Sequence, residues 1–189
     1  LSNAPSSPST SLKKAFHRTF WDDNKRLYRT FSGCDDAGHF AELTQALALC
    51  CRAVPAEHAD FVRGKLADRD NGLVKTTLSY AIYKFEALLQ DADQYAGPVF
   101  DMIASDWGDM LFKGATSFWE TIRGADDFEK AGSLCHGWSA IPVYFFYAYI
   151  LGIKPLAPGF AKYSEHPLRM VVDCAAGEVP APFGMIKTG

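Results

Sequence analysis

The sequence predicts a mainly helical protein whose helices form antiparallel hairpins, followed by a short region of β-structure. The clearest helical spacing lies between residues 78 and 89, where one stripe collects Leu78, Ala81, Ile82, Phe85, Leu88 and Leu89. Helix formers joined by short loops dominate up to residue 151, as in a helical bundle or an α/α toroid. After Gly152, prolines and glycines interrupt any helical pattern.

The N-terminal part begins with a segment that we do not expect to fold. Residues 1–10 start with Ser-Asn-Ala after the first leucine and are rich in Pro and Ser, which is typical of a cloning remnant or a disordered linker. Ser11 can cap a first helix that continues through Phe20. The sequence from residue 22 to 40 breaks the helical period and is loop-like.

Further helices follow in order along the chain. We expect them over residues 40–53, 56–67, 78–89 and 93–112, with Val99, Phe100, Ile103 and Met110 facing inward in the last of these. A final helix starts at Ser139 as its N-cap, carries Pro142 in its first turn and ends at Gly152. Short extended pieces, LRMVVD and FGMIK, follow in the C-terminal part.

Composition excludes several classes of protein. A net charge of −3 and a pI near 5.9 give no dominant basic face, so we expect no nucleic-acid partner. The longest apolar run, residues 140–151, is shorter than the roughly 20 residues that cross a bilayer, so we expect a buried helix and no membrane partner.

Cysteine and histidine spacing gives no sign of a metal or cofactor. The five cysteines include no Cys-x-x-Cys pair, and their odd number does not suggest a disulfide framework, which leaves the cellular compartment open. His17, His39, His58 and His166 have no partner at metal-ligand spacing. We therefore predict no metal site and no cofactor.

One stretch carries the chemistry. Glu120 follows two aromatic residues, Phe118 and Trp119, and sixteen residues later His136 lies within the sequence Cys-His-Gly-Trp-Ser. A carboxylate can move protons, an imidazole can donate a hydrogen bond, and aromatic rings offer flat faces to the C–H groups of a sugar. This combination is what a sugar-cleaving pocket needs.

Four ordered blocks of sequence resemble a known family. They are W-G-x-M at 107–110, G-A-T-x-F-W-E at 114–120, S-L-C-H-G-W-S at 133–139 and L-G-x-x-P-L-x-P-G-F at 151–160. Together they resemble the C-terminal portion of bacterial α-L-rhamnosidases of glycoside hydrolase family 78. In that family a six-hairpin (α/α)6 barrel holds the active site and a β-sandwich follows it. The resemblance implies a partial toroid over residues 11–154 and the truncated start of a sandwich over 155–189.

The resemblance also implies roles for three residues. Glu120 matches the general base of an inverting glycosidase, His136 the residue that hydrogen-bonds the rhamnose hydroxyls, and Trp107 an aromatic residue of the pocket wall. We expect Trp119 and Trp138 to lie in the core instead. The family's general acid belongs to an earlier hairpin, and this chain has no counterpart of it.

Two classes of function stay open at this point. The first is a fragment of an inverting α-L-rhamnosidase that carries the general base and is inactive alone, with a rhamnose-containing glycan or glycoside as its partner. The second is a non-catalytic helical module of the same fold that binds carbohydrate or protein; a toroid hydrolase acting on uronides is a weaker third choice. Half a barrel would expose apolar helix faces, so a homo-oligomer is also expected.

Overall fold

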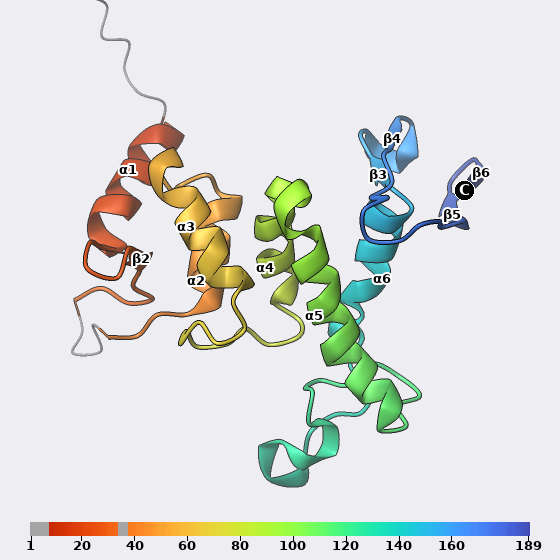
Figure 1. The fold of residues 1–189 in the computed structure, drawn as a ribbon, viewed down its shortest axis with the longest axis horizontal. Coiled ribbons are helices and arrows are strands. Elements are labelled where there is room, and N and C mark those ends of the chain that lie inside the picture. The colour runs from red at the N-terminus through yellow and green to blue at the C-terminus, as the bar shows by residue number, and fades with distance from the viewer. Residues whose placement is uncertain (1–7, 34–37) are drawn as a thin grey trace, which may run out of the picture. The chain divides into compact units, whose positions relative to one another are not determined.

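The computed structural model describes residues 8–33 and 38–189 (Figure 1). About half of the chain is helical, and the strands form short antiparallel pairs. The chain divides into two compact units, Leu1–Gln90 and Asp91–Gly189. Most of the predicted linker, residues 1–7, and Cys34 lie outside the described residues.

The first unit is built from four α-helices and one small hairpin in its described part. Its elements are α1 (Pro8–Phe20), β1 (Trp21–Asp22), β2 (Leu27–Tyr28), α2 (Glu42–Cys50), α3 (Ala56–Ala67), α4 (Ala81–Leu88) and the 3-10 turn η1 (Leu89–Asp91). The helices expected over 40–53, 56–67 and 78–89 are confirmed. The expected N-cap at Ser11 is wrong, because α1 begins three residues earlier, at Pro8.

A hairpin replaces part of the loop that we expected over residues 22–40. Asp22 Oδ1 accepts hydrogen bonds from the backbone N–H groups of Asn24 at 3.0 Å and Lys25 at 2.9 Å, which closes the turn. Arg26 completes the turn in the left-handed conformation, with φ 56°. Side-chain capping of a turn by aspartate does not depend on apolar periodicity, so the periodicity could not reveal this hairpin.

A buried carboxylate holds α2 against α4 and the loop before α4. Glu42, 2% exposed, accepts hydrogen bonds at Oε1 from Lys84 Nζ at 2.8 Å, Asn71 Nδ2 at 2.9 Å and Lys75 Nζ at 3.2 Å. Its Oε2 accepts the Thr76 N–H at 3.2 Å. Burial acts to raise the pKa of Glu42, but these hydrogen bonds and the Lys84 charge outweigh it and hold the pKa below its ordinary value.

Removing this charge should destabilise the first unit. We expect Glu42→Gln to lower the free energy of unfolding by roughly 3 kcal/mol, because the Lys84 ammonium would stay buried without its counter-ion. Urea denaturation followed by circular dichroism measures the change. Glu57→Gln makes the same chemical change at an exposed position of α3 and should leave the urea midpoint nearly unchanged. Equal midpoints for the two variants would contradict the role of Glu42.

A cluster of rings joins α1 to α3. Trp21 stacks on His58 with ring centroids 4.5 Å apart, and His17 lies 5.0 Å from Trp21 and 6.1 Å from His58. His17 Nδ1 is 2.7 Å from the Tyr28 hydroxyl. Burial, followed by the charge of His58, lowers the pKa of His17, although Asp23 and Glu57 act in the opposite direction.

This shift makes the stability of the first unit depend on pH. The unfolded chain takes up a proton at His17 near pH 6.5, before the folded chain does, so folding stability should fall as the pH drops below 6.5 toward the folded pKa. Thermal melts from pH 7.5 to 5 measure the slope, and His17→Gln should flatten it. His166→Gln, an exposed histidine of the second unit, is the control. A slope that His17→Gln leaves intact would refute this assignment.

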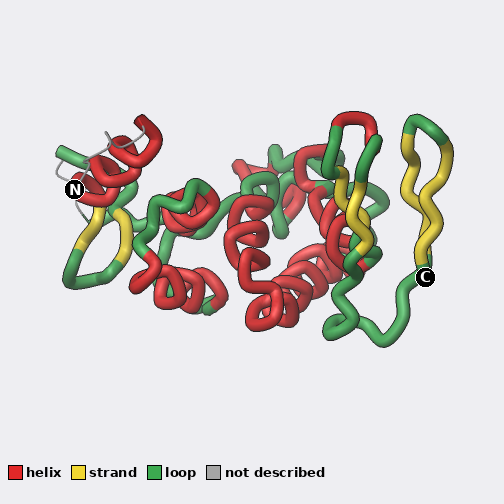
Figure 2. Tube along the Cα trace, turned by 90° about the horizontal axis from the view of Figure 1, so that it is seen from above, coloured by secondary structure: helices red, strands yellow, loops and turns green. Residues whose placement is uncertain are grey.

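The second unit begins with a long helix and ends with two hairpins (Figure 2). Its α5 (Ala92–Phe112) is followed by an excursion, which we define as residues 113–140. The excursion holds three 3-10 turns, η2 (Gly124–Asp126), η3 (Phe128–Lys130) and η4 (Gly137–Ser139). Then come α6 (Ile141–Phe145), the π-helix η5 (Phe146–Ile150), β3 (Ile153–Pro155), η6 (Pro158–Phe160), β4 (Tyr163–Glu165), β5 (Gly177–Ala181) and β6 (Gly184–Thr188).

Several expectations for this unit are confirmed and two are wrong. Val99, Phe100, Ile103 and Met110 are buried as predicted, and Gly152 ends the last helical segment with φ 76°. Ser139 is not the N-cap of the last helix, because it lies inside η4 and the helix follows Ala140. The segment LRMVVD forms turns rather than a strand, whereas FGMIK contributes to β6.

A small apolar cluster fastens the C-terminal hairpin. Leu151, Ile153, Val179 and Ile186 bury one another, and Phe160 is partly buried against them. β5 and β6 therefore contribute one buried side chain each, Val179 and Ile186, and Ala181 of β5 is partly buried against the same cluster. Within residues 8–33 and 38–189, no helix is long and apolar enough to cross a membrane.

Candidate functional site

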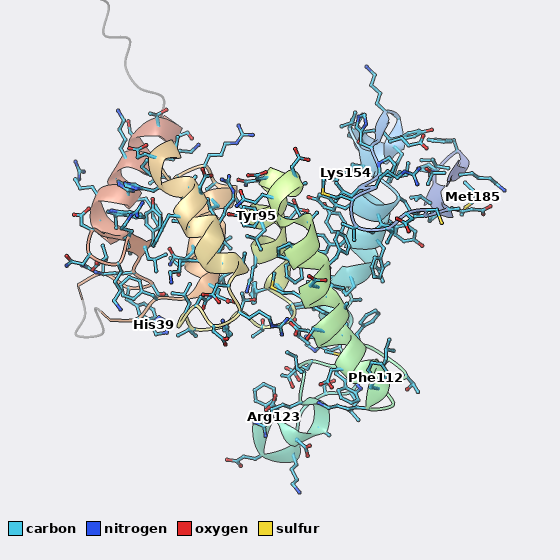
Figure 3. All side chains as sticks on the ribbon, in the orientation of Figure 1. His39, Tyr95, Phe112, Arg123, Lys154 and Met185 are labelled. Atoms are coloured by element: carbon cyan, nitrogen blue, oxygen red, sulfur yellow. The ribbon has the colours of Figure 1, made fainter. Side chains whose placement is uncertain are left out.

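The excursion starts where α5 is stopped by a glycine. Gly114 has φ 85°, its N–H donates to the Leu111 carbonyl at 3.0 Å, and the Ala115 N–H donates to the Met110 carbonyl at 3.0 Å. This pair of hydrogen bonds is the Schellman motif, which satisfies the last carbonyls of a helix and turns the chain away from its axis. Figure 3 labels Phe112 at the end of α5 and Arg123 in the excursion.

Two segments of the excursion run antiparallel to each other, and we call them the paired segments, 117–120 and 133–136. The Glu120 N–H donates to the Ser133 carbonyl at 2.9 Å, and the His136 N–H donates to the Phe118 carbonyl at 2.7 Å. The Ser117 hydroxyl also donates to the Leu134 carbonyl. The backbones of the two residues singled out by the sequence, Glu120 and His136, therefore lie on neighbouring stretches of chain.

Glu120 is fixed twice by the same partner. Its Oε2 accepts the Ser133 N–H at 3.2 Å, in addition to the backbone hydrogen bond from its own N–H. Within the described part of the chain, its other oxygen, Oε1, has no hydrogen-bond partner, and the side chain is half-buried. One carboxylate oxygen is thus held by the protein, while the second is open to a hydrogen bond from water.

His136 stands beside an exposed tryptophan. Its ring centroid lies 6.2 Å from that of Trp138, and the two planes meet at 70°. Trp138 is 76% exposed, so the expectation that it belongs to the core is wrong. The 3-10 turn η4 causes this exposure: the Ser139 N–H donates to the His136 carbonyl at 3.0 Å, which buries Ser139 and turns Trp138 outward. Trp119 is half-buried, beside Gly124.

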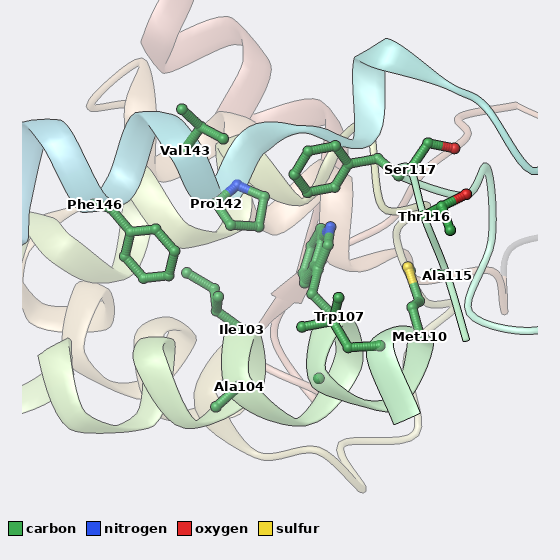
Figure 4. A pocket seen from close by; sticks show the side chains of 13 residues that line it. Ile103, Ala104, Trp107, Met110, Ala115, Thr116, Ser117, Pro142, Val143 and Phe146 are labelled. Carbon is green, nitrogen blue, oxygen red and sulfur yellow. The ribbon is translucent and has the colours of Figure 1, made fainter. Parts of the chain in front are cut away.

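Trp107 lies on a separate feature, an apolar cavity between α5 and α6 (Figure 4). The tryptophan is 6% exposed, and its Nε1–H donates to the Ser139 carbonyl at 2.8 Å. The cavity encloses about 410 Å³, and Phe118, Phe146 and Met110 also line it. Glu120 and His136 do not line it. A single concave surface that holds Glu120, His136 and Trp107 therefore stays a prediction.

The described residues contain no group of three or more His, Cys, Asp or Glu side chains that could hold a metal ion.

A glycine in the excursion tests the geometry of the paired segments. Gly124 has φ 58°, and a Cβ there would come within 2.6 Å of the Trp119 ring, one residue before Glu120. We expect Gly124→Ala to cost about 1–3 kcal/mol of local stability. Hydrogen exchange should then accelerate at the amides of Ser133 and His136, which the paired segments protect.

Gly137→Ala is the matched control, because a Cβ at Gly137 meets nothing within 4 Å. It should leave the exchange of both amides unchanged. Unaltered protection in Gly124→Ala would show that Trp119 and Gly124 do not support the paired segments.

The chain is similar in sequence and in fold to known rhamnosidases. No protein-family model matches the chain. The chain is 27% identical, over 191 aligned positions, to an α-L-rhamnosidase of Alteromonas sp. (strain LOR), and the match covers 93% of this chain and 20% of that protein. The chain therefore spans about a fifth of the length of its curated relative.

Two solved structures are also similar. The crystal structure of a family 78 rhamnosidase of Bacillus sp. GL1 matches with a TM-score of 0.80 and 27% identity, covering 93% of this chain and 19% of that one. A rhamnosidase from Klebsiella oxytoca with rhamnose bound matches with a TM-score of 0.60 and 23% identity, covering 72% and 27% respectively, and supports the fold alone. The resemblance to family 78 α-L-rhamnosidases that the sequence blocks indicated is confirmed.

Proposed function

We propose that this chain is the part of an inverting α-L-rhamnosidase that carries the general base, and that it is inactive alone. The observation that carries the proposal is the fixed carboxylate of Glu120 beside the segment of His136, in a chain similar to rhamnosidases over 93% of its length. The substrate would be a rhamnose-containing glycan or glycoside. In fold, we propose half of an (α/α)6 toroid over 11–154 and the start of a β-sandwich over 155–189.

Glu120 would act on water. The free oxygen Oε1 would accept a proton from a water molecule as the water oxygen attacks the anomeric carbon of the rhamnosyl unit. The bond from that carbon to the leaving-group oxygen would break, and a separate acid would protonate the leaving group. The released rhamnose would have the opposite anomeric configuration. The Ser133 N–H would keep the carboxylate in place during the reaction.

The general acid is the part that this chain lacks. Inverting enzymes place it roughly 6.5–9.5 Å from the base, across the scissile bond. The sequence contains no counterpart of the family's acidic motif, so the acid would come from another part of a longer polypeptide. His136 would hydrogen-bond the sugar hydroxyls and Trp107 would belong to the wall of the pocket.

A binding module is the second candidate. Trp138, 76% exposed beside His136, is a surface that a sugar could contact without being cleaved. A helical module of this fold that binds carbohydrate or protein would need His136 and Trp138 but not Glu120. The dependence of activity on Glu120 separates the two candidates.

A chimera gives the direct test. This chain would replace the matching segment of the Bacillus sp. GL1 rhamnosidase, with which it shares a TM-score of 0.80. We expect the chimera to hydrolyse an aryl α-L-rhamnoside, and Glu120→Gln to lower kcat by about 10²–10⁴-fold. Glu120→Ala should be partly rescued by azide, a nucleophile that needs no base, whereas a variant that is merely misfolded should not respond.

Glu129→Gln is the control, because Glu129 is an exposed carboxylate of the same excursion. It should keep the activity of the parent chimera. A folded chimera that loses nothing with Glu120→Gln would exclude Glu120 as the base and favour the binding module.

The isolated chain should show two further properties. We expect no useful turnover of an aryl α-L-rhamnoside, because the acid that protonates the leaving group is missing. We also expect self-association, because Leu111 and Phe112 at the end of α5 are 71% and 95% exposed. Kinetic assays beside an active full-length enzyme test the first property, and light scattering tests the second. Robust turnover, or a strictly monomeric species at high concentration, would contradict the corresponding expectation.

A further inference from the structure

We infer that Trp138, and not Trp107, is the aromatic platform on which the sugar stacks. This inference rests on the proposed function and deepens it, because it assigns a substrate-binding role to a residue for which the sequence predicted a place in the core. It rests on the exposure of the two rings, the hydrogen bonds that they make and the position of each ring relative to His136.

The two tryptophans differ in what they can offer a ligand. Trp107 is 6% exposed, and its only polar group is used by the Ser139 carbonyl at 2.8 Å. Trp107 anchors the end of the excursion to α5 and lines the apolar cavity, but at 6% exposure it leaves no open face on which a sugar could lie flat. Trp138 is 76% exposed and keeps its ring open to solvent. An exposed indole offers a flat apolar face that the C–H groups of a pyranose can cover, and Trp138 offers this face next to the imidazole of His136.

The rings of His136 and Trp138 form a corner. The imidazole of His136 meets the indole plane at 70° with a centroid distance of 6.2 Å. A sugar lying flat on the indole would therefore meet the imidazole at its side, where the ring hydroxyls are. Apolar stacking and a hydrogen bond to the same rhamnosyl unit are then compatible, which is the usual division of work between aromatic and polar groups in a sugar site.

The corner is preorganised by backbone hydrogen bonds on both sides. The His136 N–H is held by the Phe118 carbonyl at 2.7 Å, and the Ala140 N–H is held by the Gly137 carbonyl at 3.1 Å. Trp107 then fixes Ser139, directly after Trp138. The backbone that carries both rings is thus set before a ligand arrives, which lowers the entropy lost on binding.

Kinetics of the chimera described above test the inference. Trp138→Leu keeps an apolar side chain but removes the flat ring, and we expect it to raise KM for an aryl α-L-rhamnoside about tenfold with kcat changed less than about twofold. Trp138→Phe should keep KM within about threefold of the parent, because it retains an aromatic face. Phe183→Leu, at a 63% exposed ring in the turn between β5 and β6, is the matched control and should change neither constant.

The outcomes separate the two proposals. If Glu120→Gln abolishes activity while Trp138→Leu leaves KM unchanged, the platform is refuted and the base assignment stands. If Trp138→Leu raises KM and Glu120→Gln has no effect, the base assignment fails and the platform stands. A Trp138→Leu variant whose loss lies in kcat, or that Trp138→Phe fails to rescue, also overturns the platform.

If the chimera is inactive, binding to the isolated chain decides. The indole N–H resonance of Trp138, assigned with Trp138→Phe, should shift when L-rhamnose is added at millimolar concentration, whereas that of buried Trp107 should shift less. No shift at Trp138 under saturating sugar would overturn the inference.

Discussion

The double hydrogen bonding between Glu120 and Ser133 is the constraint on which the candidate site depends. The Ser133 carbonyl accepts from the Glu120 backbone at 2.9 Å, and the Ser133 N–H donates to the Glu120 carboxylate at 3.2 Å. A single residue thus fixes both the main chain and the side chain of the proposed base. The same pairing aligns Phe118 with His136, and so brings the imidazole to the neighbouring stretch of chain.

The surrounding second unit holds the two ends of this excursion. At the start, the Schellman motif at Gly114 turns the chain away from α5, and at the end Trp107 on α5 holds the Ser139 carbonyl. A rigid helix therefore supports both ends of a stretch that has little regular structure of its own. Binding and catalytic residues often lie on loops that a scaffold positions in this way.

The sequence was sufficient for most helices but not for the details of the site. Apolar residues spaced with a period of 3.6 predicted α4 and α5, and Gly152 predicted the end of the last helical segment. Such predictions succeed because a helix that buries one face leaves a local pattern in the sequence. The exposure of Trp138 and the burial of Trp107 depend on contacts between residues 32 positions apart, such as Trp107 with Ser139, and no local pattern encodes them. Ser139 shows the same limit: it is a favourable N-cap residue, yet tertiary contacts bury it inside a 3-10 turn.

A crystal structure of the chimera with L-rhamnose bound tests the central claim most directly, namely that the paired segments place Glu120 and His136 around one sugar. Our account predicts a hydrogen bond of about 2.6–3.2 Å from His136 to a ring hydroxyl, and a water molecule between the Glu120 carboxylate and the anomeric carbon. The Ser133 N–H should still bond Glu120. A sugar bound elsewhere, with Glu120 and His136 directed to opposite faces of the unit, would contradict it.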